Sequence, residues 1–73
     1  MNDKKVYWQG ELGPEDDFGK KYDNVMYDAK TRSGPWANMS YVSWVRFGVG
    51  KLGTGYGQRY ERQANGRWLK VEG

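Results

Sequence analysis

The 73-residue chain contains no cysteine and no histidine. The absence of cysteine excludes disulfide bonds, and without either residue type thiolate or imidazole ligation of zinc is impossible. The commonest nucleophile and general base of enzymes are missing as well, and Ser40 and Ser43 have no candidate base near them in the sequence. We therefore expect a protein that is not an enzyme and that uses no metal and no cofactor.

Long apolar runs are also absent. No stretch approaches the roughly 20 apolar residues that span a bilayer, and the N-terminus lacks the apolar core of a signal peptide. We predict a single soluble cytoplasmic domain over residues 1–73, without membrane contact and with a disordered tail at 1–4. We expect a monomer or a small homo-oligomer.

Aromatic residues are abundant, with four Trp, six Tyr and two Phe. Each ring can bury on the order of 150–250 Å², so we interpret most of them as core that compensates for the missing cross-links. Trp36 is interpreted as a core anchor packed against Pro35. The alternative is that two or three rings form an exposed binding platform, and composition leaves both open.

Short strands and glycine-rich connections alternate along the chain. Residue type predicts strands at 5–9 and within 23–29, and loops at 10–21 and 48–57. The strongest local signal is Asn65-Gly66, which predicts a β-hairpin between residues 58–62 and 67–71. In the first of these strands Tyr60 and Arg62 would share one face, opposite Arg59 and Glu61.

Residues 35–47 fit two elements. Pro35 and Gly48 are typical of the start and stop of a helix, whereas residues 41–47 are rich in strand formers. We predict a helix over 35–47. The expected fold class is α+β, a small domain with a short antiparallel sheet, one short helix and a C-terminal β-hairpin.

The net charge of +3 is unevenly distributed. Residues 1–28 carry −3 and residues 29–73 carry +6, and the basic part is interleaved with aromatic residues. This composition is typical of nucleic-acid surfaces, where cations contact phosphates and rings stack on unpaired bases. The predicted nucleic-acid-binding residues are Lys51, Arg59, Tyr60, Arg62, Arg67, Trp68 and Lys70. The alternative is a solvated face whose charges pair partly with the acidic N-terminal part.

Two further patterns have weaker interpretations. The Gly48-x-Gly50-x-x-Gly53 spacing lacks the βαβ context of a dinucleotide site, so we interpret it as a connector, with an anion-binding nest beside Lys51 as the alternative. The acids at 15–17 lack the spacing of a calcium loop, and we expect them to be exposed.

Residues 27–63 resemble a group of small phage and prophage zinc-knuckle proteins. The resemblance is carried by Gly34-Pro35-Trp36-Ala37-Asn38-Met39 followed by Leu52-Gly53-Thr54-Gly55-x-Gly57-Gln58-Arg59-Tyr60. In that group one Cys-x-x-Cys pair directly follows the first motif, and here Ser40 and Ser43 occupy its positions. The other pair would fall near residues 7–10. The resemblance implies a metal-free treble-clef or zinc-ribbon remnant in the cytoplasm of a host cell.

These patterns together favour a non-catalytic binding module of phage type. We expect it to bind nucleic acid through the basic, aromatic C-terminal hairpin. The alternatives are a protein-interaction or host-inhibitor domain that uses an aromatic surface, and a structural accessory protein. The expected partner is accordingly nucleic acid or a host protein.

Overall fold

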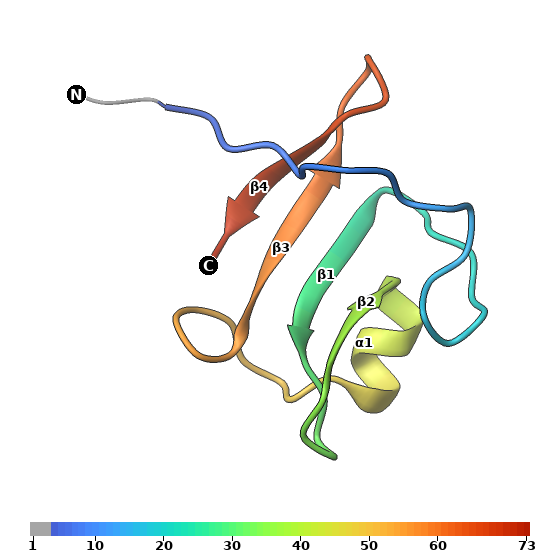
Figure 1. Cartoon of the computed structure of the whole chain (residues 1–73), viewed down its shortest axis with the longest axis vertical. Helices are drawn as coiled ribbons and strands as arrows, with labels where there is room; N and C mark the ends of the chain where they lie inside the picture. Colours follow the sequence, from blue (N-terminus) through green and yellow to red (C-terminus); the bar gives the residue numbers. More distant parts are fainter. Residues whose placement is uncertain (1–3) are drawn as a thin grey trace.

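The computed structural model describes residues 4–73. Within them the chain forms β1 (Val25–Lys30), β2 (Trp36–Met39), α1 (Tyr41–Phe47), β3 (Gly57–Arg62) and β4 (Trp68–Glu72). The strands build one antiparallel sheet in the order β2-β1-β3-β4 (Figure 1). The predicted α+β class, with one short helix and a C-terminal hairpin, is therefore confirmed. No helix in the described part of the chain is long and apolar enough to cross a membrane.

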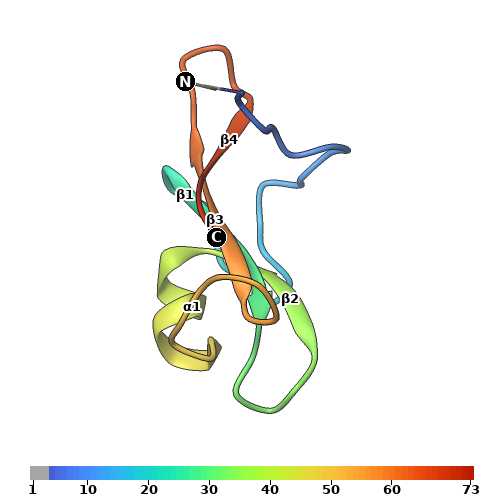
Figure 2. The ribbon, with the colours of Figure 1, turned by 90° about the vertical axis from the view of Figure 1, so that its left-hand side faces the viewer.

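The two faces of the sheet are covered by different segments (Figure 2). Helix α1 packs on one face against β1 and β2, and the segment that precedes β1 crosses the other face. Successive side chains of a strand point to opposite faces, so neighbouring Met26 and Tyr27 of β1 are both buried, one in each layer. The central strand thus contributes to two small cores.

The core on the helix side is built on a stacked pair of rings. Tyr27 and Trp44 lie 4.6 Å apart between ring centroids, with their planes inclined by only 2°. Beside them Ala29 pairs with Gly57 of β3, where a Cβ would come within 2.2 Å of the Ala29 Cβ. Close packing of β1 on β3 therefore requires glycine at this position.

The core on the other side consists of edge-on aromatic contacts. Trp8 meets Tyr60 at 5.6 Å between centroids, and Tyr22 meets Trp68 at 5.7 Å. Met26 is fully buried between them. Such edge-to-face pairs add about 0.5–1.5 kcal/mol each beyond area burial, so rings from the N-terminal segment hold that segment on the sheet.

The helix predicted over residues 35–47 is wrong in its first half. Residues 36–39 form β2, paired with β1 from Lys30↔Trp36 to Tyr27↔Met39, and α1 begins only at Tyr41. The local Pro signal for a helix start is overridden because residues 36–39 pair with β1 along an antiparallel hydrogen-bond ladder. Trp36 is 51% exposed on this edge strand, so its interpretation as a core anchor is also wrong.

Pro35 belongs instead to the turn between β1 and β2. Its carbonyl oxygen accepts hydrogen bonds from the backbone N–H of Thr31 at 2.9 Å and from the Thr31 hydroxyl at 2.7 Å. Both donors lie at the end of β1, so the turn is closed by polar contacts. Proline fits here because a turn position, unlike a position in a central strand, does not require a backbone N–H donor.

The predicted strand at 23–29 corresponds to β1, and the hairpin around Asn65-Gly66 corresponds to β3 and β4. The Asn65 side chain accepts a hydrogen bond from the N–H of Arg67 at 2.9 Å, and Gly66 adopts a φ of 85°. Asn65 itself has no positive φ, so the connection is not the two-residue turn typical of Asn-Gly but a longer one, closed by hydrogen bonds from Gln63 N–H to the Arg67 carbonyl at 2.7 Å and from Gly66 N–H to the Gln63 carbonyl at 2.9 Å. The predicted loops at 10–21 and 48–57 contain no helix, and their only strand residue among those described is Gly57. The expected disordered tail at 1–4 lies outside the described residues, apart from Lys4.

The strand predicted at 5–9 is reduced to a single bridge, between Tyr7 and Leu69. Two hydrogen bonds flank it, from Trp8 N–H to the Trp68 carbonyl at 2.9 Å and from Lys70 N–H to the Val6 carbonyl at 2.8 Å. The segment therefore protects part of the β4 edge, which would otherwise be open to pairing with another chain.

Candidate nucleic-acid interface

Two cation–ring pairs lie at the turn end of the C-terminal hairpin. Arg62 and Trp68 are cross-strand neighbours of β3 and β4, and the Arg62 Cζ lies 4.7 Å from the centroid of the Trp68 ring. The Arg67 Cζ lies 4.1 Å from the centroid of Tyr7, which the N-terminal segment brings to the hairpin. Lys70 shares the face of Arg62, since it pairs with Tyr60. We call Tyr7, Arg62, Arg67, Trp68 and Lys70 the hairpin-end surface.

The cations of the hairpin-end surface carry uncompensated charge. Across residues 4–73 no carboxylate lies within ion-pair distance of Arg62, Arg67 or Lys70. Both arginines are exposed and Lys70 is half-buried. Contact with a ring restrains a guanidinium without neutralising its charge. The attraction between cation and ring contributes about 0.5–1 kcal/mol when the pair is exposed. The two arginines are therefore restrained by rings while their charge stays without a carboxylate partner among residues 4–73.

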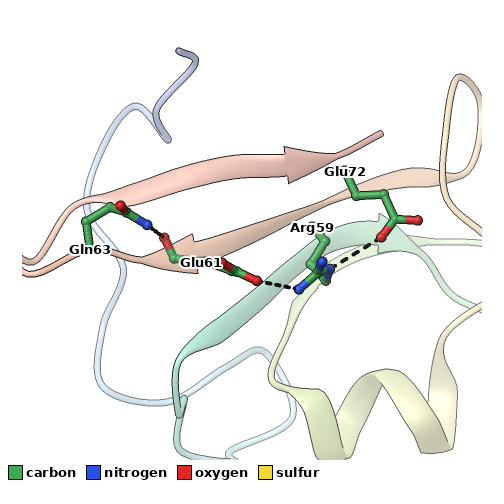
Figure 3. Close-up of polar contacts among 4 residues, drawn as sticks. All are labelled: Arg59, Glu61, Gln63 and Glu72. Atoms are coloured by element: carbon green, nitrogen blue, oxygen red, sulfur yellow. Dashed lines mark hydrogen bonds and ion pairs between the residues drawn. The ribbon is translucent and has the colours of Figure 1, made fainter. Parts of the chain in front are cut away.

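Arg59 belongs to a different surface. It lies on the opposite face of β3, as the alternation of Arg59 with Tyr60 predicts, between Glu61 at 2.8 Å and Glu72 at 3.4 Å (Figure 3). Burial acts to lower the pKa of Arg59, but hydrogen bonds to the two carboxylates outweigh it and raise that pKa above its usual value. Gln63 is bonded to the Glu61 carbonyl at 3.1 Å in the same view. Two carboxylates neutralise this arginine, so it is a poor phosphate contact.

Two other predicted residues lie away from the hairpin-end surface. Tyr60 is only 5% exposed and its hydroxyl donates to Gln58 at 3.1 Å, so its ring belongs to the core and cannot stack on a base. Lys51 lies in the glycine-rich loop, at the end of β3 remote from the hairpin turn (Figure 1), and its Nζ sits 4.8 Å from the Tyr56 ring. The structure thus brings together Arg62, Arg67, Trp68 and Lys70 of the seven predicted residues.

The glycine-rich loop uses several of its own N–H groups. Gly53 N–H and Gly57 N–H each bond to the carbonyl of the other residue, and Tyr56 N–H bonds to the Gly53 carbonyl, all at 2.8–2.9 Å. Donors engaged inside the loop are not available to an anion. This geometry favours a tightly turned connector over an anion-binding nest.

A cavity of about 320 Å³ adjoins the hairpin-end surface. It opens between the N-terminal segment and the hairpin turn. Its lining residues are Trp8, Gly10, Glu11, Leu12, Gly66, Arg67 and Trp68. Arg67 and Trp68 belong to both the cavity and the hairpin-end surface, so one ligand could engage both.

Sequence reasoning missed the contribution of Tyr7 and Trp8 to this region. Both were assigned to an ordinary strand, and nothing local indicates that the segment docks on β4. The only signal is the composition of Val6-Tyr7-Trp8, an apolar run followed by polar residues in an acidic segment. Its pairing partner, 60 residues away, is a non-local contact.

A second polar cluster lies at the start of α1. Asp16 is only 7% exposed, so the expectation that the acids at 15–17 are all exposed is wrong for this residue. Its carboxylate accepts backbone hydrogen bonds from Ser40 at 2.7 Å, Lys20 at 2.8 Å and Phe18 at 2.9 Å. Burial acts to raise the pKa of Asp16, but hydrogen bonds from Ser43, Ser40 and Lys20 outweigh it and lower the pKa to about 2.

Ser40 and Ser43 form the N-terminal cap of α1. Ser40 has an extended backbone, and its hydroxyl accepts a hydrogen bond of 3.3 Å from the N–H of Ser43. The partner of this pair is Asp16, whereas Tyr7 and Trp8, in the segment expected to match the other cysteine pair, are paired with β4. A carboxylate with so low a pKa is a weak base. No group of three or more potential metal-ligating side chains occurs in residues 4–73.

The chain matches no family model, no curated protein and no solved structure. A function has to be assigned from the side chains that the fold brings together. The cluster around Asp16 is buried and its hydrogen bonds are satisfied, whereas the hairpin-end surface is exposed and charged. Of these two clusters, the hairpin-end surface is therefore the better candidate for a binding site.

Proposed function

We propose that the protein is a non-catalytic module that binds nucleic acid through its hairpin-end surface. Two exposed arginines carry this proposal. Arg62 lies over the ring of Trp68, and Arg67 lies over the ring of Tyr7. Neither arginine has a carboxylate partner among the described residues. Arginine forms two parallel hydrogen bonds to a phosphate. Contacts of this kind fix the position of the backbone without reading its sequence.

The preferred ligand is single-stranded. The hairpin-end surface places rings next to cations, and stacking of a base on an aromatic ring contributes about 1–3 kcal/mol when the base is unpaired. A duplex shields its base faces, so it would use only the cations. Three cations at one end of a molecule measuring 37 × 26 × 18 Å offer few contacts to a duplex backbone.

Fluorescence anisotropy with a labelled single-stranded oligonucleotide and the matching duplex tests this proposal. We expect the single strand to bind more tightly, and the double variant Arg62→Ala/Arg67→Ala to lose about tenfold or more in affinity. The matched control is Arg46→Ala/Lys51→Ala, since both cations also sit over rings but lie elsewhere. Absence of wild-type binding, or an equal loss in the control, would overturn the proposal.

A second candidate function is protein interaction through α1. The outward side chains Tyr41, Val42 and Val45 are 50–55% exposed, which is unusual for apolar residues of a short helix in so small a domain. Affinity capture from a nuclease-treated bacterial lysate tests it, with Val42→Glu/Val45→Glu as the comparison. A partner retained by the wild type and lost by this variant would support the second function over the first.

A further inference from the structure

We infer that the cavity beside the hairpin-end surface receives one unpaired guanine base of a single strand. This inference rests on the proposed function and adds the base that the site prefers. The cavity volume of about 320 Å³ falls at the lower end of the roughly 300–1,000 Å³ of small-molecule sites. It has room for one base and not for a folded partner.

The position of the cavity suits a base whose phosphates are bound next to it. Arg67 lines the cavity and also belongs to the hairpin-end surface, with its guanidinium over Tyr7. A strand held by Arg62 and Arg67 therefore passes the mouth of the cavity. Trp8 and Trp68 are the aromatic residues of the lining, and aromatic side chains favour a planar ligand.

Glu11 gives the cavity its selectivity. A carboxylate next to a phosphate-binding surface repels phosphate, so its place in the lining fits a ligand group that donates hydrogen bonds. Glu11 and Arg67 line the same cavity, yet no ion pair joins Glu11 to any cation in the described residues. Both charges are therefore available to a ligand that combines an anion with donors, as a nucleotide does.

Guanine is the base that matches this acceptor best. Its N1–H and N2–H₂ groups lie side by side, so both can donate to the two oxygens of one carboxylate, whereas adenine, cytosine and thymine each present a single donor group on the same edge. Guanine also carries the acceptor O6 beside N1.

Glycine keeps the rim of the cavity open. Gly10 and Gly66 have φ values of 92° and 85°, a region that side chains rarely adopt. A Cβ at either position would meet no atom within 4 Å, so nothing in the protein fills the space beside them. A base can therefore enter from the side of the hairpin turn without displacing the backbone.

Anisotropy titrations with plain oligothymidine and with three substituted oligothymidine strands test the inference. The strands carry one central guanine, one adenine or one hypoxanthine, which lacks the 2-amino group. We expect the guanine strand to bind the wild type about fivefold or more tightly than the adenine strand, with hypoxanthine between them. In Glu11→Gln this preference should shrink while affinity for plain oligothymidine stays equal or increases, because a negative charge is lost.

Glu15→Gln is the matched control, since Glu15 is an exposed acid of the same segment that does not line the cavity. It should keep the guanine preference. Equal binding of the three strands by the wild type, or loss of the preference in the control, would overturn the guanine site and leave the proposed function standing. If no strand binds, both proposals fail.

Discussion

The backbone N–H of Ser40 donates a 2.7 Å hydrogen bond to the carboxylate of Asp16, 24 residues earlier in the chain. Phe18 and Lys20 donate to the other oxygen of the same carboxylate. One buried side chain therefore closes its own loop and joins that loop to the start of α1. In a chain without disulfides, this contact links the N-terminal segment to the helix side of the sheet.

Replacing Asp16 should destabilise the protein in a pH-dependent way. Its pKa falls from 3.8 to about 2 on folding, so the ionised form stabilises the fold above pH 4, and this contribution is lost as the pH falls towards 2. We expect Asp16→Asn to cost about 2 kcal/mol at neutral pH. Urea unfolding of wild type and variant across pH 2–7 measures both effects.

The exposed neighbour Glu15 provides the control for this measurement. Glu15→Gln should unfold like the wild type at every pH, because the Glu15 side chain is exposed and forms no hydrogen bond or ion pair within residues 4–73. If Asp16→Asn retained the wild-type loss of stability between pH 4 and 2, another group would have to be its cause.

Arg32 should stabilise the C-terminal end of α1. Its guanidinium donates to the carbonyls of Gly48 at 3.1 Å and Val45 at 3.0 Å, and also to that of Arg46. Carbonyls in the last turn of a helix lack partners and favour a cation. We expect Arg32→Ala to lower the free energy of unfolding by about 1–2 kcal/mol, measured by urea denaturation.

Arg46→Ala is the comparison for Arg32, since Arg46 lies in the same turn and its side chain contacts the Phe47 ring. We expect it to change stability by less than about 0.5 kcal/mol. Equal losses in the two variants would mean that the charge near the helix end matters and the specific hydrogen bonds do not.

Gly57 should tolerate no side chain. A Cβ there would lie 2.2 Å from the Ala29 Cβ and 2.9 Å from the Asp28 carbonyl oxygen, and the φ of 145° adds strain. We expect Gly57→Ala to cost about 3 kcal/mol or more. Gly55 is the control, because it has a φ of 86° but open space around it, so a side chain there meets backbone strain without a steric clash. Gly55→Ala should therefore cost only about 1 kcal/mol. Thermal unfolding of both variants measures this difference, and equal losses would contradict the role of the close approach between β1 and β3.

Tyr7 should contribute to binding more than to folding. Its ring lies under Arg67, and we expect Tyr7→Leu to weaken single-strand binding about fivefold through lost stacking and a less restrained guanidinium. Tyr56→Leu removes the equivalent ring under Lys51 and should leave binding unchanged. A fall in affinity with both variants, or with neither, would contradict the assignment of the surface.

Local signals predicted part of this fold well. The strand at β1 and the hairpin at Asn65-Gly66 depend on residues close in sequence, and both are present. The split of residues 35–47 into β2 and α1 was not predictable in the same way, because strand pairing with β1 decides it. Ser40 was interpreted only as occupying a cysteine position of the resembling group, and its role as a helix cap held by Asp16 requires the three-dimensional contact.

The candidate site was predictable to a similar extent. Strand alternation separates Arg62 from Arg59 once the hairpin is known, but nothing in the sequence shows that Glu61 and Glu72 neutralise Arg59 or that Tyr60 is buried. The docking of Tyr7 on the hairpin is equally non-local. The resemblance to phage zinc-knuckle proteins, which is carried by residues 34–39 and 52–60, stays a prediction.

The salt dependence of single-strand binding tests the central claim most directly. The logarithm of the binding constant falls with the logarithm of salt concentration by about 0.7 for each phosphate contact. If Arg62, Arg67 and Lys70 make those contacts, the wild-type slope should be about −2, and Arg62→Ala/Arg67→Ala should flatten it by about 1.4. An unchanged slope in that variant, or an equal change in Arg46→Ala/Lys51→Ala, would contradict the claim that the hairpin end binds nucleic acid.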